Sequence, residues 1–394
     1  RLVFGGAGPV SLESLIGPVT VSTDIVLNNP SGPFNNMGVP GAKSFHLLFD
    51  GLGNPANLAT QTANPYFVRM ASSPTATMLG DALAQSPTFF TLSEIGGNDV
   101  LGYATSGGDG SDPITDTAAF NDALNALVDG LTAGGAKGAV TNVPYITALP
   151  HFTTVTHNVI PLDAATAGAV NAAYAQYNGG IVQAFAFLVA NTPMTQEMAD
   201  AEIAKRTIMF EEATDNAVVI MDETLTDLTQ INPQLVSMRQ ATADDMFVLP
   251  ASSFIGTEAI PGNPLSVNGV AIPLADKWVL LPSEQEEIKM ATDAYNQTIS
   301  SVVASKGLAL VDLNSILTTA STTGIKFDEF NMNTELVFGG LVSLDGIHLT
   351  PRGYALMANE FLKAIDATYG SNFTASGTVA KAYDYPINFP AVLQ

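Results

Sequence analysis

Cysteine is absent from the 394-residue chain. Its absence excludes disulfide bonds, thiolate metal sites and a cysteine nucleophile, and it is compatible with an oxidising compartment. Charge is also scarce, because only 13% of the residues are Asp, Glu, Lys or Arg. Lys and Arg number 14 against 37 Asp and Glu, which gives a net charge of −23. This shortage of positive charge argues against nucleic acid and anionic membrane surfaces as partners.

Long apolar runs are missing as well. No stretch reaches the roughly 18 apolar residues of a membrane-spanning helix, so we expect no transmembrane segment. The opening Arg1–Gly6 has neither an initiator Met nor the charged-then-apolar order of a signal peptide. We therefore expect a fragment or a mature form. Hydrophobic residues make up 46% of the chain, enough to build one large α/β domain or two ordinary ones.

Strand and helix patterns alternate along much of the chain. The β-prone run Thr88–Ser93 precedes Thr115–Thr132, whose apolar residues have helical spacing, and Lys137–Val143 follows as a second strand. Leu308–Val311 is predicted to be the last strand. This order is typical of an α/β fold with a parallel sheet and helical crossovers.

Three further helices are predicted, two of them from their capping residues. Thr77–Gln85 is a short helix, and Ser283–Ala304 is a long one with Ser283 as its cap and Glu286 at the capping-box position. The third helix begins at Pro351, with Thr350 as its N-cap.

The region 145–275 is predicted to be a large, mostly helical insertion in a single domain that spans 1–394. It contains a helix at Ala164–Val189 interrupted by Gly179-Gly180, a second helix at Met194–Glu212 and a strand at Asn216–Met221. A separate domain with its own core remains an alternative.

The N-terminal 35 residues are rich in Gly, Pro, Ser and Asn and are predicted to be mainly loop. Val19–Val21 and Ile25–Leu27 are at most short strands. Phe34–Gly38 is predicted to be a short strand that ends in the glycine-rich loop Gly38–Gly41.

One short stretch, Asp345-Gly-Ile-His348, points to chemistry. A carboxylate three residues before a histidine can orient the imidazole, which is half of a triad that activates a nucleophile. The alternative is a loop aspartate that caps a turn beside a surface histidine.

Two glycine- and asparagine-bearing loops strengthen the catalytic interpretation. Asn98, in Gly96-Gly97-Asn98-Asp99, directly follows a predicted strand, and so does Gly38. Ligands of open α/β sheets bind at the carboxyl ends of the strands. There the Gly38 N–H and the Asn98 side chain would donate to a developing oxyanion, with His348 as the base and Asp345 as its orienter.

These three motifs resemble sequence blocks of the SGNH (GDSL-type) esterase and lipase superfamily. Gly96–Asp99 is similar to the block that carries the oxyanion asparagine, Asp345–His348 to the Asp-x-x-His block, and Asn36–Gly41 to the block that carries the oxyanion glycine. The resemblance covers about residues 34–365.

The resemblance implies a flavodoxin-like three-layer α/β/α fold with a five-stranded parallel sheet. It implies ester hydrolysis by a Ser-His-Asp triad with a Gly/Asn oxyanion hole, without metal or other cofactor. The insertion and the phrase Asn98–Tyr103 also resemble secreted or lipoprotein members from Bacteroidetes-type bacteria. The expected location is accordingly secreted, periplasmic or anchored in the outer membrane.

The first block of the family, Gly-Asp-Ser with the nucleophilic serine, is not found. Ser11 and Ser14 are the early serines, but no Gly-Asp precedes them, and proline breaks the segment between them and Gly38. We therefore expect an upstream N-terminal segment to supply the serine and the first strand. In a flavodoxin-like order that strand is central, so without it buried backbone groups would be unpaired.

Other interpretations remain. The main alternative to an esterase acting on a carbohydrate or lipid ester is a non-catalytic ligand- or glycan-binding protein on the same fold, since the serine is missing. A dinucleotide-binding enzyme is disfavoured because no Gly-x-Gly-x-x-Gly follows a strand. His46, His151 and His157 lack metal-ligand spacing, and Asp109–Asp112 fits an ordinary turn better than a calcium loop.

Overall fold

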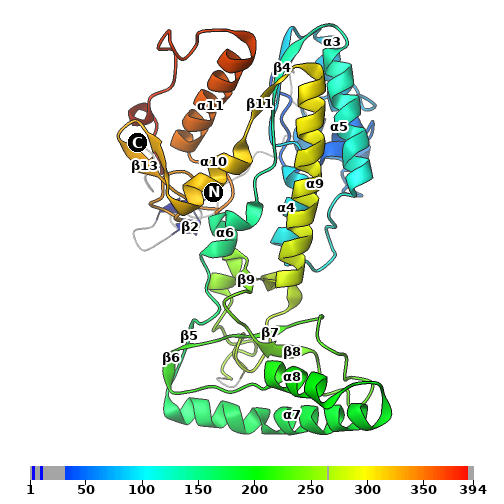
Figure 1. Cartoon of the computed structure of the whole chain (residues 1–394), viewed down its shortest axis with the longest axis vertical. Helices are drawn as coiled ribbons and strands as arrows, with labels where there is room; N and C mark the ends of the chain where they lie inside the picture. Colours follow the sequence, from blue (N-terminus) through cyan, green and yellow to red (C-terminus); the bar gives the residue numbers. More distant parts are fainter. Residues whose placement is uncertain (1, 5–8, 12–31, 264–265, 389–394) are drawn as a thin grey trace. The chain divides into compact units, whose positions relative to one another are not determined.

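The computed structural model describes residues 2–4, 9–11, 32–263 and 266–388; Ser14 and the strands expected at 19–21 and 25–27 lie outside them. Contacts divide the chain into two compact units (Figure 1). The first comprises Arg1–Gly102, Pro113–Pro150 and Glu287–Gln394, and the second comprises Tyr103–Asp112 and His151–Glu286. Most of the region 145–275 belongs to the second unit. That this region is an insertion in one hydrolase-like domain stays a prediction.

A three-stranded parallel sheet lies in the first unit. Its strand order is β11 (Ala309–Val311), β4 (Lys137–Thr141), β3 (Phe89–Leu92), with Phe89 opposite Lys137 and Ala309 opposite Ala139. Helices α4 (Gly97–Thr105) and α5 (Thr117–Thr132) connect β3 to β4 along the chain. The predicted α/β class with a parallel sheet is thus confirmed at this level.

The strands leave no gap inside the sheet, because β4 pairs with both β3 and β11. A strand from another segment would therefore have to add at an outer edge, beside β3 or β11, rather than between two described strands. The predicted strand Phe34–Gly38 is wrong: these residues are loop, and the Gly38 N–H donates to Asn36 Oδ1 at 2.9 Å. Such a local side-chain bond competes with a strand ladder for the backbone.

Helix α5 shows how the core is built. Asp116 caps its first turn, accepting from the Ala118 and Ala119 N–H groups, and the helix ends ahead of Gly135 with φ +80°. One face of the helix is buried, with the 3.6-residue spacing that predicted it: Phe120, Ala123, Leu124, Leu127, Val128 and Leu131.

Helix α9 (Pro282–Lys306) begins one residue earlier than predicted. Proline is favoured at the first helical position, because its missing N–H would have no partner there anyway. The residue that reaches back to the cap is Glu284, not Glu286: its Oε2 accepts the Leu281 N–H at 2.6 Å.

Helix α11 (Pro351–Tyr369) follows the sequence pattern closely. Thr350 Oγ1 accepts the Gly353 N–H at 2.9 Å, Pro351 is the first helical residue, and Gly370 ends the helix with φ +70°. The helix packs against β11 and β4. This packing positions the loop that precedes the helix.

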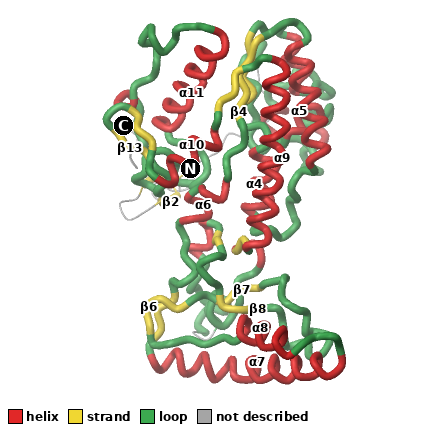
Figure 2. The backbone as a smooth tube through the Cα atoms, in the orientation of Figure 1, coloured by secondary structure: helices red, strands yellow, loops and turns green. Residues whose placement is uncertain are grey.

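The second unit differs from its prediction in three elements (Figure 2). Helix α7 (Ala164–Asn191) runs without interruption through Gly179-Gly180. A glycine inside a helix costs only about 1 kcal/mol relative to alanine, which the packing of a long helix can offset. A Cβ on Gly180 would stand 2.8 Å from Leu235 Cδ2, so the glycine also allows close packing. Helix α8 is shorter than predicted, Gln196–Arg206. The strand expected at 216–221 is two strands, β6 (Ala213–Asn216) and β7 (Val219–Met221).

The remaining helices are short except for α10. They are α2 (Pro65–Val68), α3 (Met78–Ala84), α6 (Pro150–Thr153) and α10 (Leu313–Thr322). Each of the remaining strands belongs to an antiparallel pair, β5 with β6, β8 with β7, and the others with one another: β1 (Leu2–Phe4), β2 (Pro9–Ser11), β5 (Ile160–Leu162), β8 (Met238–Gln240), β9 (Met246–Phe247), β10 (Val279–Leu280), β12 (Ile325–Phe327) and β13 (Phe330–Met332). Among the described residues, no helix has both the length and the apolar character to cross a membrane.

Candidate active site

The loop before α11 holds a histidine against a carboxylate. Asp345 Oδ2 accepts the His348 Nδ1–H at 2.7 Å. Asp345 Oδ1 accepts three more donors: the Ile347 N–H at 2.9 Å, the His348 N–H at 3.0 Å and the Ser343 hydroxyl at 2.7 Å. Gly346, with φ +75°, makes the turn between the two partners. The carboxylate is therefore fixed by the loop itself and in turn fixes the ring.

These contacts set the charges of the pair. Burial alone would raise the pKa of Asp345, but the hydrogen bonds from His348, Ile347 and Ser343 hold it well below its usual range. The pKa of His348 is raised, chiefly by its hydrogen bond to Asp345, although burial opposes the rise. With Nδ1–H committed to Asp345, the neutral ring has its lone pair on Nε2, and 63% of the side chain is exposed. The pair thus has the geometry of an oriented base that a substrate can reach.

The turn after β3 brings another carboxylate to this region. Glu94 has φ +58°, a left-handed conformation that costs a non-glycine residue of order 1 kcal/mol. Its N–H donates to the buried Thr141 Oγ1 at 2.7 Å, at the carboxyl end of β4. The negative charge of Glu94 adds a smaller contribution to the rise in the pKa of His348 than the hydrogen bond to Asp345 does.

Asn98 is the second residue of α4, separated from β3 by the turn at 93–96, rather than at the strand end itself. Its Nδ2 donates to the Ala42 carbonyl at 3.0 Å, which joins it to the loop that contains Gly38. An asparagine amide has two hydrogens, so one contact leaves a donor over. The Gly38 N–H, by contrast, is engaged by Asn36 Oδ1. No hydrogen bond joins Asn98 or Gly38 to His348 within the described part of the chain.

Asp99 anchors the end of the same loop through Ser44. It is 1% exposed and accepts the Ser44 N–H at 2.9 Å and the Ser44 hydroxyl at 2.7 Å. The structure therefore brings Asn98 to the Gly38 loop and His348 to Asp345.

A polar network at the carboxyl ends of β4 and β11 was missed from the sequence. Asn142 Nδ2 donates to Asp312 Oδ1 at 2.7 Å, and Asn142 Oδ1 accepts the Asn314 N–H at 3.0 Å. Asn296 bonds both the N–H and the carbonyl of Val143. The available signal was an amide directly after an apolar strand, Asn142 following Val140-Thr141.

Two of the other histidines have different surroundings. His46 Nδ1 accepts the Lys43 N–H at 3.0 Å, and His151 is buried with its ring 4.9 Å from that of Phe152. Asp109 Oδ1 accepts the Ser111 N–H at 2.9 Å, which makes the stretch after it a turn.

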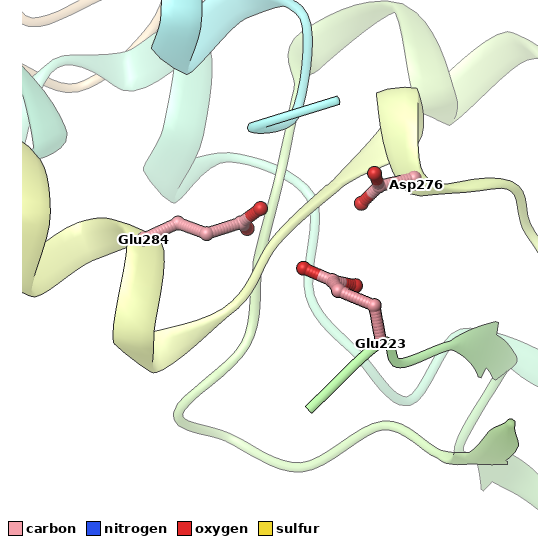
Figure 3. A group of neighbouring side chains, drawn as sticks. All are labelled: Glu223, Asp276 and Glu284. Atoms are coloured by element: carbon pink, nitrogen blue, oxygen red, sulfur yellow. The ribbon is translucent and has the colours of Figure 1, made fainter. Parts of the chain in front are cut away.

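Three carboxyl groups meet in the second unit (Figure 3). One oxygen each from Glu223, Asp276 and Glu284 lie within 4.8 Å of one another, and Glu284 is only 4% exposed. Burial and neighbouring carboxylates raise the pKa of Asp276 to about 6 and that of Glu284 to about 8. A proton held by Glu284 at neutral pH reduces the repulsion among the three groups. The sequence did not indicate this cluster, because its members are separated by 53 and 8 positions (276 − 223 and 284 − 276).

Comparisons with known proteins return no relative: no family model, no curated protein and no solved structure matches this chain.

Proposed function

We propose that the protein is a serine-dependent ester hydrolase of the SGNH (GDSL) type, acting on an acyl ester of a carbohydrate or a lipid. The observation that carries the proposal is the Asp345–His348 hydrogen bond, in which a carboxylate with three other donors orients an exposed imidazole. The three-layer SGNH fold, the location in the bacterial cell envelope and the resemblance to lipoprotein members belong to the same proposal.

In this mechanism His348 Nε2 takes the proton of a serine hydroxyl as the serine oxygen attacks the ester carbonyl. The oxyanion that forms is stabilised by the Asn98 amide and the Gly38 N–H. Collapse of the intermediate breaks the bond to the alcohol, which leaves with the proton from His348, and water then releases the acid by the same steps. Asp345 holds the ring and stabilises its protonated form throughout.

The mechanism needs two groups that these contacts do not supply: a nucleophilic serine and an unengaged Gly38 N–H. The serine would come from a segment beyond these 394 residues, because no Gly-Asp-Ser occurs in them. The Gly38 N–H must leave Asn36 Oδ1 before it can serve an oxyanion. Both points also favour the alternative, a non-catalytic protein that binds a ligand or glycan on the same fold.

The test uses the full gene product with p-nitrophenyl acetate as substrate. We expect hydrolysis, and His348→Ala should lower kcat/KM by about 10³-fold or more, since the serine loses its base. His157→Ala, in the second unit, is the matched control and should leave the rate unchanged.

A fluorophosphonate probe separates the two candidate functions. Labelling of a serine upstream of Arg1 that depends on His348 supports the esterase. Absence of both labelling and hydrolysis in the full gene product supports the binding protein, and hydrolysis that survives His348→Ala contradicts the assignment of the base.

A further inference from the structure

We propose that Ser343 is a positioning residue of the candidate active site, whose hydroxyl holds the Asp345 carboxylate in the orientation that keeps the His348 ring in place. Ser343 acts through Asp345 and does not itself touch the substrate. The consequence for catalysis rests on the proposed esterase function, whereas the effect of Ser343 on the His348 ring can be measured without a substrate.

Ser343 contacts both partners of the pair. Its hydroxyl donates to Asp345 Oδ1 at 2.7 Å, and its N–H donates to the His348 carbonyl at 2.7 Å. The Ser343 carbonyl accepts the Gly346 N–H at 2.9 Å, which closes the turn between the partners. Ser343 therefore lies opposite His348 where the two arms of the loop meet, and Asp345 lies in the turn that they enclose.

The two arms of this loop are anchored in the core. Val342 and Leu349 form an antiparallel bridge, and the Thr350 N–H donates to the Leu341 carbonyl at 2.9 Å. Leu341 and Val342 are each only 2% exposed. Because the backbone that carries Ser343 is held in this way, its hydroxyl gives the carboxylate a fixed direction as well as a donor.

The two oxygens of the Asp345 carboxylate divide the contacts. Oδ2 accepts the His348 ring N–H, whereas Oδ1 accepts the Ser343 hydroxyl and the N–H groups of Ile347 and His348. Rotation of the carboxylate moves both oxygens together, so the contacts to Oδ1 decide where Oδ2 points. The two backbone donors belong to the turn itself and hold the carboxylate only relative to that turn. Ser343 ties it to the anchored arm.

A second carboxylate in the same unit has the same kinds of donor without a histidine. Asp366, in α11, accepts the Ser371 hydroxyl at 2.5 Å and the N–H groups of Phe373 at 2.9 Å and Thr374 at 2.8 Å. These bonds, chiefly the one from Ser371, lower the pKa of Asp366 to about 2. Ser371→Ala therefore removes an equivalent serine–carboxylate bond away from His348 and is the matched control for Ser343→Ala.

The test follows the His348 ring by nitrogen NMR of the 394-residue chain, which has four histidines. The His348 signal is identified by its loss in His348→Gln. Above the midpoint of the His348 titration, the neutral ring should carry its proton on Nδ1, which faces Asp345, whereas a ring without that partner exchanges between both tautomers. We expect Ser343→Ala to shift the ring toward this mixture and to lower the midpoint toward 6.5. Ser343→Thr keeps a hydroxyl and should retain the wild-type behaviour.

The direction of the change separates positioning from simple stabilisation of charge. A carboxylate that lost the Ser343 donor but kept its orientation would be a stronger acceptor for the imidazolium, and the His348 midpoint would rise. A carboxylate that loses its orientation holds the ring less well, and the midpoint falls. A fall in Ser343→Ala that is absent in Ser343→Thr and Ser371→Ala supports the proposal. An unchanged or raised midpoint, or an equal fall in Ser343→Thr, overturns it.

The catalytic consequence is measured on the full gene product with p-nitrophenyl acetate. We expect Ser343→Ala to lower kcat by about tenfold to a hundredfold at unchanged KM, because the substitution misplaces the base and leaves the binding of the ester alone. Ser343→Thr should restore most of the rate, and a raised KM at unchanged kcat would contradict the positioning role. A wild type without hydrolysis counts against the esterase, whereas the NMR result still decides the role of Ser343, so the two failures are distinguishable.

Discussion

Two carboxyl groups of this chain, Asp345 and Glu284, have pKa shifts of opposite sign. Burial disfavours the charge of both, yet the pKa of Asp345 lies well below its usual range and that of Glu284 is raised to about 8. Asp345 receives four hydrogen bonds, from Ser343, Ile347 and both the backbone and the ring of His348. Glu284 receives the Leu281 N–H and faces two other carboxyl groups.

Burial disfavours the charge of both groups, and the number of hydrogen-bond donors decides whether that penalty is overcome. Asp345 stays ionised and can therefore hold and stabilise a protonated imidazole. Glu284 stays protonated at neutral pH, because burial and two like-charged neighbours oppose a negative charge that a single donor would stabilise. The first arrangement suits catalysis, and the second links the stability of its unit to pH.

The largest expected effect follows from that linkage. The folded-state pKa of Glu284, about 8, lies above its ordinary 4.5, so between these values the folded state binds more protons than the unfolded state. Stability should therefore fall as pH rises from about 4.5 to about 8, and level off above. Asp276, raised to about 6, adds to the fall at the acidic end.

Glu284→Gln replaces the acid by a neutral group of the same shape. Because the substitution removes the penalty of ionising a buried carboxyl, we expect the free energy of unfolding of the variant to exceed that of the wild type by about 2 kcal/mol at pH 9. Near pH 5 the two free energies should be equal. Urea unfolding at both pH values measures this, with the exposed Glu286→Gln as control. A wild-type stability that is flat across this pH range would contradict the protonated cluster. Stabilisation by Ca²⁺ that is lost in Glu284→Gln would identify a cation in place of the protons.

A second prediction concerns the glycine that covers Glu284. A Cβ on Gly108 would stand 1.9 Å from Glu284 Oε1, whereas a Cβ on Gly110 meets nothing within 4 Å; the two glycines have nearly equal φ, +77° and +76°. Both Gly→Ala variants carry the cost of a left-handed backbone, about 1 kcal/mol. Gly108→Ala must also displace a buried carboxyl from the Leu281 N–H, so we expect it to be less stable than Gly110→Ala by about a further 1–2 kcal/mol.

Urea unfolding of both alanine variants, alone and combined with Glu284→Ala, measures this difference. In the Glu284→Ala background the obstructing carboxyl is gone, so the two variants should become equal. A difference of the same size in both backgrounds would mean that Gly108 acts through something other than Glu284.

The same contrast explains what the sequence could predict. Asp345 and His348 are three residues apart, so one loop contains the whole pair and its spacing is visible in the sequence. Helices α5 and α11 were likewise predicted from local spacing and caps. Glu223, Asp276 and Glu284 come together only through tertiary folding. The strand predicted at 34–38 failed because Asn36 bonds the Gly38 backbone, a contact that apolar patterning does not report.

The smallest expected effect tests the other half of the comparison. Asp345→Asn removes the main cause of the raised pKa of His348 but keeps a side chain of the same shape, so the midpoint of the His348 titration should fall. Glu94→Gln removes a weaker contribution of the same sign and should lower the midpoint less. Histidine NMR titrations of the two variants measure this order. Glu329→Gln, which removes an equal charge from another exposed position, is the control.

The sign of the stability change follows from the same shifts. The raised pKa of His348 stabilises the folded state below its ordinary value of 6.5, and this contribution is lost as pH rises through the folded-state pKa. The lowered pKa of Asp345 stabilises the folded state above pH 3.8, the ordinary pKa of an aspartate, and this contribution is lost only in strong acid. Asp345→Asn should therefore remove an acid-side dependence that Glu94→Gln retains. A larger fall in the His348 midpoint for Glu94→Gln than for Asp345→Asn would make Glu94, not Asp345, the dominant partner of the imidazole.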